Sequence, residues 1–112
     1  MNQIERKMLE SIKTLTPMES GNTKVDVFGK TIKVYLQNKL IADIDYSYPI
    51  EPFECDGRLI VLTENMNPLL KSRLNVILDA FHKPSICIYR GRFCFDNSWF
   101  TGSTHTFYGL DN

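Results

Sequence analysis

Hydrophobic and polar residues follow two periods along this chain, and these periods predict two helices and several short strands. Near the N-terminus, apolar side chains recur three or four positions apart and would share one side of a helix: Ile4, Met8, Ile12 and Leu15. Asn2 can accept a hydrogen bond from an early backbone N–H of this helix, and Glu5 completes an approximate capping box. Pro17 and residues 20–22 would end the helix.

Between residues 23 and 45 the period changes to two, which predicts a meander of three strands. A two-residue turn at Gly29 and Lys30, with glycine suited to type II′ geometry, would give these apolar pairs: Val27 with Ile32 and Val25 with Val34. A three-residue loop at residues 37–39 would give a second set: Leu36 with Leu40, Val34 with Ala42 and Ile32 with Ile44. The opposite face, which we expect the first helix to cover in part, would present Lys33, Tyr35, Asp43 and Asp45.

The next segments predict a buried strand followed by the second helix. Residues 58–63, RLIVLT, are apolar on both faces, as in a central strand covered on both sides. Asn67 followed by Pro68 is typical of a helix start, because asparagine caps the first turn and proline suits its first position. Pro84 would end this helix. Its apolar stripe comprises Leu70, Leu74, Ile77, Leu78 and Phe81.

Residues 85–95, SICIYRGRFCF, are nearly symmetric about Arg90 and Gly91, and this symmetry predicts a β-hairpin. A turn at these two residues gives the pairs Ile86 with Phe95, Cys87 with Cys94 and Ile88 with Phe93. The four apolar residues would face the core and the second helix, whereas the other face would carry Cys87, Tyr89, Arg92 and Cys94. A longer loop is the alternative, since arginine is not the preferred first residue of such a turn.

These elements predict an α+β fold in the order α-β-β-β-β-α-β-β. An antiparallel sheet, made of the meander and the C-terminal hairpin, would pack against two helices in a single domain, residues 1–112. Residues 1–20 would form the first helix and a linker, residues 21–100 the sheet with the second helix, and residues 101–112 a tail. The charged N-terminus has no apolar run of signal-peptide or transmembrane length, so we expect a cytoplasmic protein without a membrane partner.

Charge is balanced in total but uneven along the chain. Lys and Arg number 13, as do Asp and Glu, which argues against a general nucleic-acid binder that needs many phosphate contacts. Residues 43–64 contain six acids and one base, whereas residues 71–92 contain five bases and one acid. If folding does not interleave these blocks, such a surface suits a specific protein partner or a homodimer built from unlike patches.

Catalytic chemistry has little support in the sequence. The cysteines, Cys55, Cys87 and Cys94, are odd in number and should be reduced; the latter two are either small packing residues or a reversible disulfide pair. His82 and His105 stand at no recognised metal-ligand spacing, and the six glycines form no phosphate loop. The acidic residues from 43 to 56 suit a solvated edge better than a divalent-ion site. We therefore expect no enzyme, metal or cofactor.

The hairpin tip is the predicted binding site. Arginine and aromatic side chains most often dominate binding energy, because they bury much area and still satisfy a polar tip. We therefore predict partner binding by Tyr89, Arg90 and Arg92, with Tyr35 and Lys33 on the sheet face opposite the core. Late aromatics in a polar segment would add contact anchors: Trp99, Phe100, Phe107 and Tyr108. Stacking on single-stranded nucleic acid is the rival use, and an inert turn, with binding at residues 47–57, is the other alternative.

Several short motifs carry a family resemblance over residues 21–100. They are Gly21-Asn22-Thr23, Val34-Tyr35-Leu36, Leu40-Ile41-Ala42 and Lys71-Ser72-Arg73-Leu74-Asn75, followed by an aromatic hairpin with Phe93 and Trp99. In these the chain resembles a group of small proteins of tailed bacteriophages. The resemblance implies a setting in the cytoplasm of an infected bacterium. By analogy with compact phage accessory proteins, it implies binding to a host or phage protein complex, including immune effectors such as CRISPR complexes.

Overall fold

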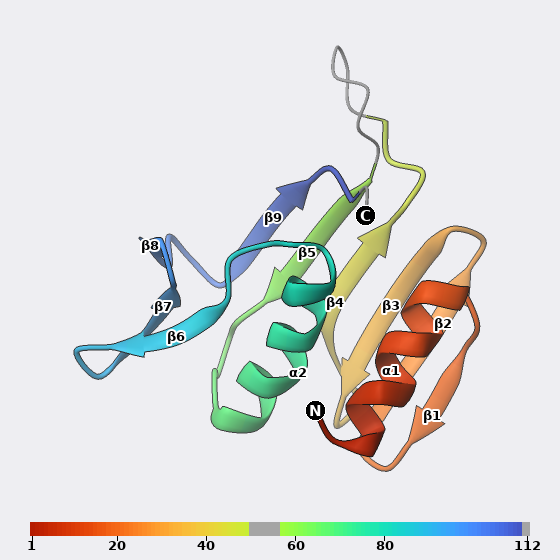
Figure 1. Cartoon of the computed structure of the whole chain (residues 1–112), viewed down its shortest axis with the longest axis horizontal. Helices are drawn as coiled ribbons and strands as arrows, with labels where there is room; N and C mark the ends of the chain where they lie inside the picture. Colours follow the sequence, from red (N-terminus) through yellow and green to blue (C-terminus); the bar gives the residue numbers. More distant parts are fainter. Residues whose placement is uncertain (50–56, 111–112) are drawn as a thin grey trace.

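The structure is a computed structural model that describes residues 1–49 and 57–110. Its elements are α1 (Gln3–Thr14), β1 (Met18–Ser20), β2 (Thr23–Phe28), β3 (Thr31–Leu36), β4 (Lys39–Asp45), β5 (Arg58–Leu62), α2 (Pro68–Ala80), β6 (Ile86–Tyr89), β7 (Arg92–Phe95), β8 (Ser98–Trp99) and β9 (Thr104–Tyr108). The main sheet is antiparallel with the order β1-β2-β3-β4-β5-β9, and β6, β7 and β8 form a second sheet. Both helices lie on one face of the main sheet (Figure 1). The predicted α+β class is confirmed, but the hairpin belongs to a sheet of its own.

Helix α1 begins with the predicted capping box. The Asn2 side chain accepts from the Glu5 N–H at 2.8 Å, and the Glu5 carboxylate accepts from the Asn2 N–H at 3.3 Å. Met8 and Ile12 are fully buried in the core. Leu15 is instead 37% exposed with φ of +55°, so it ends the helix and does not extend its apolar stripe. We had expected α1 to cover part of the opposite face of the sheet. It does not, because it packs beside α2 on the same face as that helix.

The two turns of the meander differ from each other. The turn at Gly29 and Lys30 has the predicted register, and of the two only Gly29 has positive φ, at +63°. The second turn is not the predicted three-residue loop: Gln37 and Asn38 both have positive φ, as in a type I′ turn, and Leu36 pairs with Lys39. A β-bulge then takes up the extra residue, Ile41. The bulge restores the predicted pairs Val34 with Ala42 and Ile32 with Ile44.

Strand β5 and helix α2 both contribute to the core. Leu59 and Val61 of β5 are fully buried beneath the helices. The other side of β5 is only half-buried, contrary to the prediction of a strand covered on both faces, because both helices lie on the same side. Helix α2 starts as predicted, with the Leu70 N–H donating to the Asn67 side chain at 3.0 Å. Its predicted stripe, from Leu70 to Phe81, is buried.

Three strands, β1, β8 and β9, were not predicted. Residues 104–108 are not part of a tail, because they pair with β5 and form the last strand of the main sheet. Threonines alternate there with His105 and Phe107, so the period-two pattern of a strand is present in the sequence. His105 is buried, with its Nε2 2.9 Å from the Thr63 hydroxyl, and burial lowers the pKa of His105.

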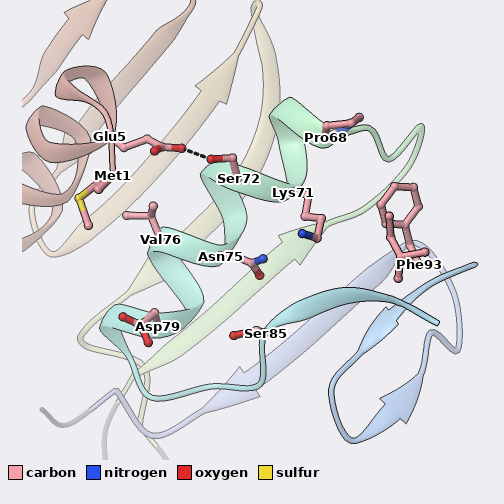
Figure 2. A pocket seen from close by; sticks show the side chains of 11 residues that line it. Met1, Glu5, Pro68, Lys71, Ser72, Asn75, Val76, Asp79, Ser85 and Phe93 are labelled. Carbon is pink, nitrogen blue, oxygen red and sulfur yellow. Dashed lines mark hydrogen bonds between the residues drawn. The ribbon is translucent and has the colours of Figure 1, made fainter.

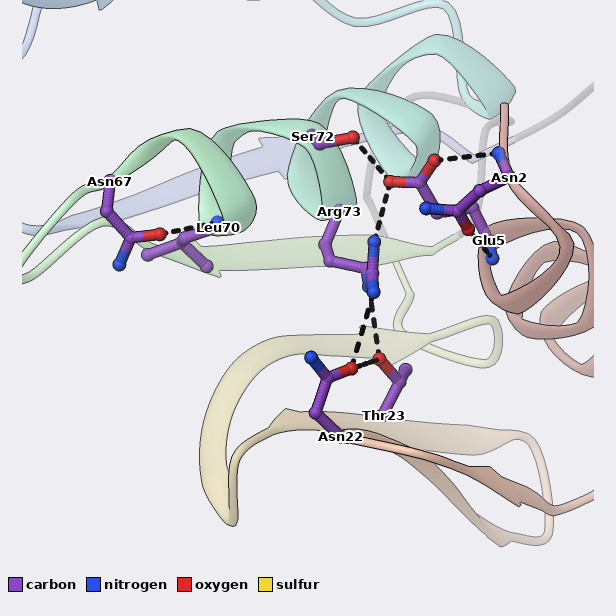
Figure 3. A network of polar contacts seen from close by, with 8 residues as sticks. All are labelled: Asn2, Glu5, Asn22, Thr23, Asn67, Leu70, Ser72 and Arg73. Carbon is purple, nitrogen blue, oxygen red and sulfur yellow. Dashed lines mark hydrogen bonds and ion pairs between the residues drawn. The ribbon is translucent and has the colours of Figure 1, made fainter.

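A buried polar network joins both helices to the start of β2 (Figure 3). Arg73, only 2% exposed, donates to Glu5 Oε2 at 2.9 Å, Thr23 Oγ1 at 3.0 Å and Asn22 Oδ1 at 3.3 Å. Ser72 also donates to the Glu5 carboxylate. Burial opposes ionisation of Glu5, but these hydrogen bonds and the Arg73 charge outweigh it and lower the pKa of Glu5.

Candidate interaction surface

The hairpin β6–β7 projects from the globule (Figure 1), and its register is the predicted one. Arg90 and Gly91 form the two-residue turn, with φ of +52° and +75°. Two positive φ values are what a type I′ turn requires, so no longer loop is needed. Strand β8 pairs with β7 and adds Trp99 opposite Cys94.

One face of this small sheet carries a cluster of aromatic and arginine side chains. We call Tyr89, Arg90, Arg92 and Trp99 the tip cluster. The rings of Tyr89 and Trp99 lie 5.8 Å apart, the Arg92 guanidinium lies 5.0 Å from the Trp99 ring centre, and that of Arg90 lies 5.3 Å from the Tyr89 ring centre. Tyr89 is 53% exposed and Trp99 46%. The tip cluster thus presents two large rings, each with an arginine over it, to solvent.

The opposite face of the hairpin is not the continuous core face that we predicted. Ile86 and Phe95, at the base, are buried, but Phe93 is half-buried and Ile88 is 58% exposed. The reason is geometric: the base of the hairpin packs closely on the rest of the fold, whereas in the outer half Phe93 reaches the core only in part. The Phe95 ring meets His105 and Phe107 of β9 edge-on, at 4.9 and 5.6 Å. The outer half therefore leaves apolar surface uncovered.

The cysteine pair lies beside the tip cluster. Cys87 and Cys94 are directly opposed, with their sulfur atoms 3.6 Å apart. Burial raises the pKa of the Cys94 thiol, and its contacts with Cys87 raise it further. A thiol of this kind is protonated at neutral pH and is a weak nucleophile. Cys55 lies outside the described residues.

The structure divides the predicted partner-binding residues between two sheets. Tyr89, Arg90 and Arg92 come together at the hairpin tip, whereas Lys33 and Tyr35 lie on β3 in the main sheet. Both β3 side chains are half-buried on the face away from the helices, where Lys33 sits between Asp26 and Asp43. The hairpin contacts the main sheet through Phe95, which packs on Phe107 of β9. In the sheet order, β4 and β5 lie between β9 and β3. The five residues therefore do not form one surface.

Trp99, which we expected only as an additional contact anchor, belongs to the tip cluster but was not among the five predicted partner-binding residues. Its signal was present as an aromatic residue in a polar segment, but strand β8, which brings it against Arg92, is too short to be seen in the pattern. Within residues 1–49 and 57–110, no three His, Cys, Asp or Glu side chains gather closely enough to hold a metal ion. No helix in this part of the chain is long and apolar enough to span a membrane.

Comparisons with protein-family models, curated proteins and solved structures give no match.

Proposed function

We propose that this chain is a binding protein that acts by occupying the surface of a partner protein, and that the tip cluster is its main contact. The observation that supports this is the pairing of two half-exposed aromatic rings with two arginines on a hairpin. Aromatic and arginine side chains are enriched among residues that dominate binding energy. Their mutual contacts also restrict their motion before binding, which lowers the entropic cost of association.

The charges of the tip cluster favour an acidic partner surface. In the described part of the chain, the ion pairs are Glu5 with Arg73 and Lys24 with Asp26. Arg90 and Arg92 therefore lie over aromatic rings without a carboxylate partner among these residues. A partner that supplies carboxylates there would gain charge-assisted hydrogen bonds, and complementary charge would also speed association.

The more specific proposal concerns the partner. The resemblance to tailed-phage proteins supports a non-enzymatic accessory role in the cytoplasm of an infected bacterium. The most suitable partner is then a host defence complex, inhibited as anti-CRISPR proteins inhibit theirs, or another host or phage protein complex. This step rests on the resemblance and on analogy with compact phage accessory proteins.

Affinity capture from host lysate tests the proposal. A tagged wild-type chain is compared with Tyr89→Ala, Arg90→Ala and Arg92→Ala, and the affinity of any captured protein is then measured with purified components. We expect binding to weaken about tenfold or more for at least one variant, which corresponds to about 1.4 kcal/mol. Lys33→Ala and Tyr35→Ala serve as matched controls on the main sheet. Unchanged affinity in all three tip variants, with a loss in the β3 variants, would move the site to β3.

Single-stranded nucleic acid is the second candidate ligand, because two exposed rings with arginines over them also suit base stacking. Binding of oligonucleotides that weakens steeply with salt would favour this candidate, since phosphate contacts release counterions. The zero net charge of the chain is the reason that we rank it second.

A further inference from the structure

A groove of about 530 Å³ separates helix α2 from the hairpin (Figure 2). Ile88, Phe93 and Val76 supply apolar lining. Lys71 and Asp79 also line the groove, eight residues apart on the helix, and Figure 2 shows Asp79 near Ser85 and Lys71 on the side toward Phe93. The groove thus combines an apolar lining with charges of opposite sign.

Asn75, another residue that lines the groove, connects helix α2 to strand β6. The Ile86 N–H donates to Asn75 Oδ1 at 2.7 Å, and Asn75 Nδ2 donates to the Ile86 carbonyl at 2.9 Å. One side-chain amide therefore satisfies both backbone groups of Ile86, as a residue of a neighbouring strand would. This shows that the edge of β6 faces α2 and offers its backbone groups in that direction.

The same edge continues beyond Asn75 with open hydrogen-bonding groups. In an antiparallel hairpin, residues alternate between those that bond to the partner strand and those that point outward. Ser85 bonds to Asp96 and Ile86 points outward, so the N–H and C=O of Ile88 also point outward, toward the groove. No hydrogen bond from a residue in the described ranges reaches either group of Ile88.

We propose that this groove binds an extended segment of the partner protein, which adds to β6 as a further strand. Its backbone pairs with Ile88, and its apolar side chains pack on Ile88 and Phe93. The inference rests on the proposed function and specifies how the partner is held, by strand addition at an exposed sheet edge. The tip cluster would then contact the same partner next to the added strand.

The charges around the groove indicate that the bound segment is acidic. Lys71 in the groove and Arg90 and Arg92 at the tip have no carboxylate partner among the described residues. A segment with carboxylates at this end of the groove would neutralise them. A second copy of this chain fits less well, because pairing two β6 edges would bring these cations close to their own counterparts.

Synthetic peptides provide the probe for this inference. An acetylated, amidated peptide of alternating valine and glutamate is titrated against the labelled chain, beside a matched peptide of valine and lysine, with amide NMR as the readout. We expect the glutamate peptide to bind at least tenfold more tightly and to slow hydrogen exchange of the Ile88 amide. Equal binding of both peptides, or shifts confined to Tyr89 and Trp99, would overturn the proposal.

Two substitutions of Ile88 separate the backbone contact from the side chain. Ile88→Pro removes the outward N–H without removing a bond to β7, because that N–H is not part of the hairpin ladder. Ile88→Val keeps the N–H and serves as the matched control. We expect at least tenfold weaker peptide binding for the proline variant alone. Hydrogen exchange of the wild-type Ile88 amide decides the matter if the proline variant does not fold.

Different results would overturn strand addition and the proposed binding function. Partner capture that needs Tyr89 but tolerates Ile88→Pro would overturn strand addition and leave the binding function standing. Capture that tolerates every tip and groove variant would overturn both. A shift to dimers in sedimentation, abolished by Ile88→Pro, would assign the groove to a second copy and also overturn the proposed occupant.

Discussion

Three arginines of this chain, Arg73, Arg90 and Arg92, occupy two contrasting environments, although they lie in one basic stretch of sequence. Arg73 is 2% exposed, and side chains from α1, β2 and the preceding turn accept its hydrogen bonds. Arg90 and Arg92 are exposed and lie over aromatic rings. The first arginine holds the elements of the fold together, whereas the other two remain available to a partner.

The comparison shows that the basic stretch is not one charged surface. Arg73 is neutralised by Glu5, and Lys83 donates to the carbonyl groups of Tyr108 and Gly109 at 3.0 and 2.9 Å. A lysine at this position also protects the end of edge strand β9. The remaining basic residues of the stretch, Lys71, Arg90 and Arg92, are those of the groove and the tip cluster.

The largest effect should follow from Arg73→Ala. This change leaves the Glu5 carboxylate buried without its cation and removes the partners of Thr23 and Asn22. Breaking a buried pair in this way costs about 3–5 kcal/mol. Urea unfolding of the variant should show this loss of unfolding free energy.

A double variant is the control for Arg73→Ala. Glu5→Gln together with Arg73→Met removes both charges and should lose less stability than the single change, because no unpaired charge stays buried. Arg90→Ala, at the hairpin turn, should change stability by less than about 0.5 kcal/mol. Equal losses for Arg73→Ala and Arg90→Ala would show that burial does not distinguish the two arginines.

An intermediate effect should follow from Asn75→Ala, because the Asn75 side chain connects helix α2 to the hairpin strand β6. Both hydrogen bonds to the buried Ile86 backbone are lost, and leaving such groups unsatisfied costs about 1–3 kcal/mol. Hydrogen exchange should quicken most at Ile86 and its neighbours in the hairpin. Asp79→Ala, an exposed change on the same helix, is the control and should leave exchange in the hairpin unaltered; equal quickening in both would contradict the role of Asn75.

Local patterns explain which parts of the fold could be predicted. The capping box, the Gly29 turn and the pairing of Cys87 with Cys94 each depend on residues close in sequence, and all three are confirmed. The bulge at Ile41 could not be predicted in the same way, because a two-residue turn with a bulge gives the same distant pairs as a longer loop. Strand β9 has a suitable pattern but pairs with β5, more than forty residues away in sequence.

The candidate site was predictable only in part, for a related reason. The hairpin and its tip residues follow from the symmetry of residues 85–95, but the division into two sheets depends on tertiary packing. The roles of the motif residues named in the sequence analysis also depend on tertiary structure, because residues distant in sequence meet in the folded chain. Asn22, Thr23, Ser72 and Arg73 meet in the buried polar network, and Asn75 fastens β6. These motif residues therefore help to hold the fold together.

The smallest effect on stability, and the most specific one on the tip cluster, should follow from Arg92→Lys. Lysine keeps the positive charge but lacks the planar guanidinium that lies 5.0 Å from the Trp99 ring centre. We expect unfolding free energy to change by less than about 0.5 kcal/mol, because the site is exposed. Partner affinity should fall about two- to fivefold, the value of one exposed cation–π contact.

Trp99 is the only tryptophan of the chain, so its fluorescence reports on this contact directly. Arg92→Lys should shift the emission of Trp99, whereas the matched change Arg90→Lys, whose guanidinium lies over Tyr89, should leave it unaltered. Both variants keep the same net charge, so a difference between them cannot arise from long-range electrostatics. If emission and partner affinity respond equally to the two changes, stacking on Trp99 does not shape the binding surface, and charge alone accounts for the contribution of the tip arginines.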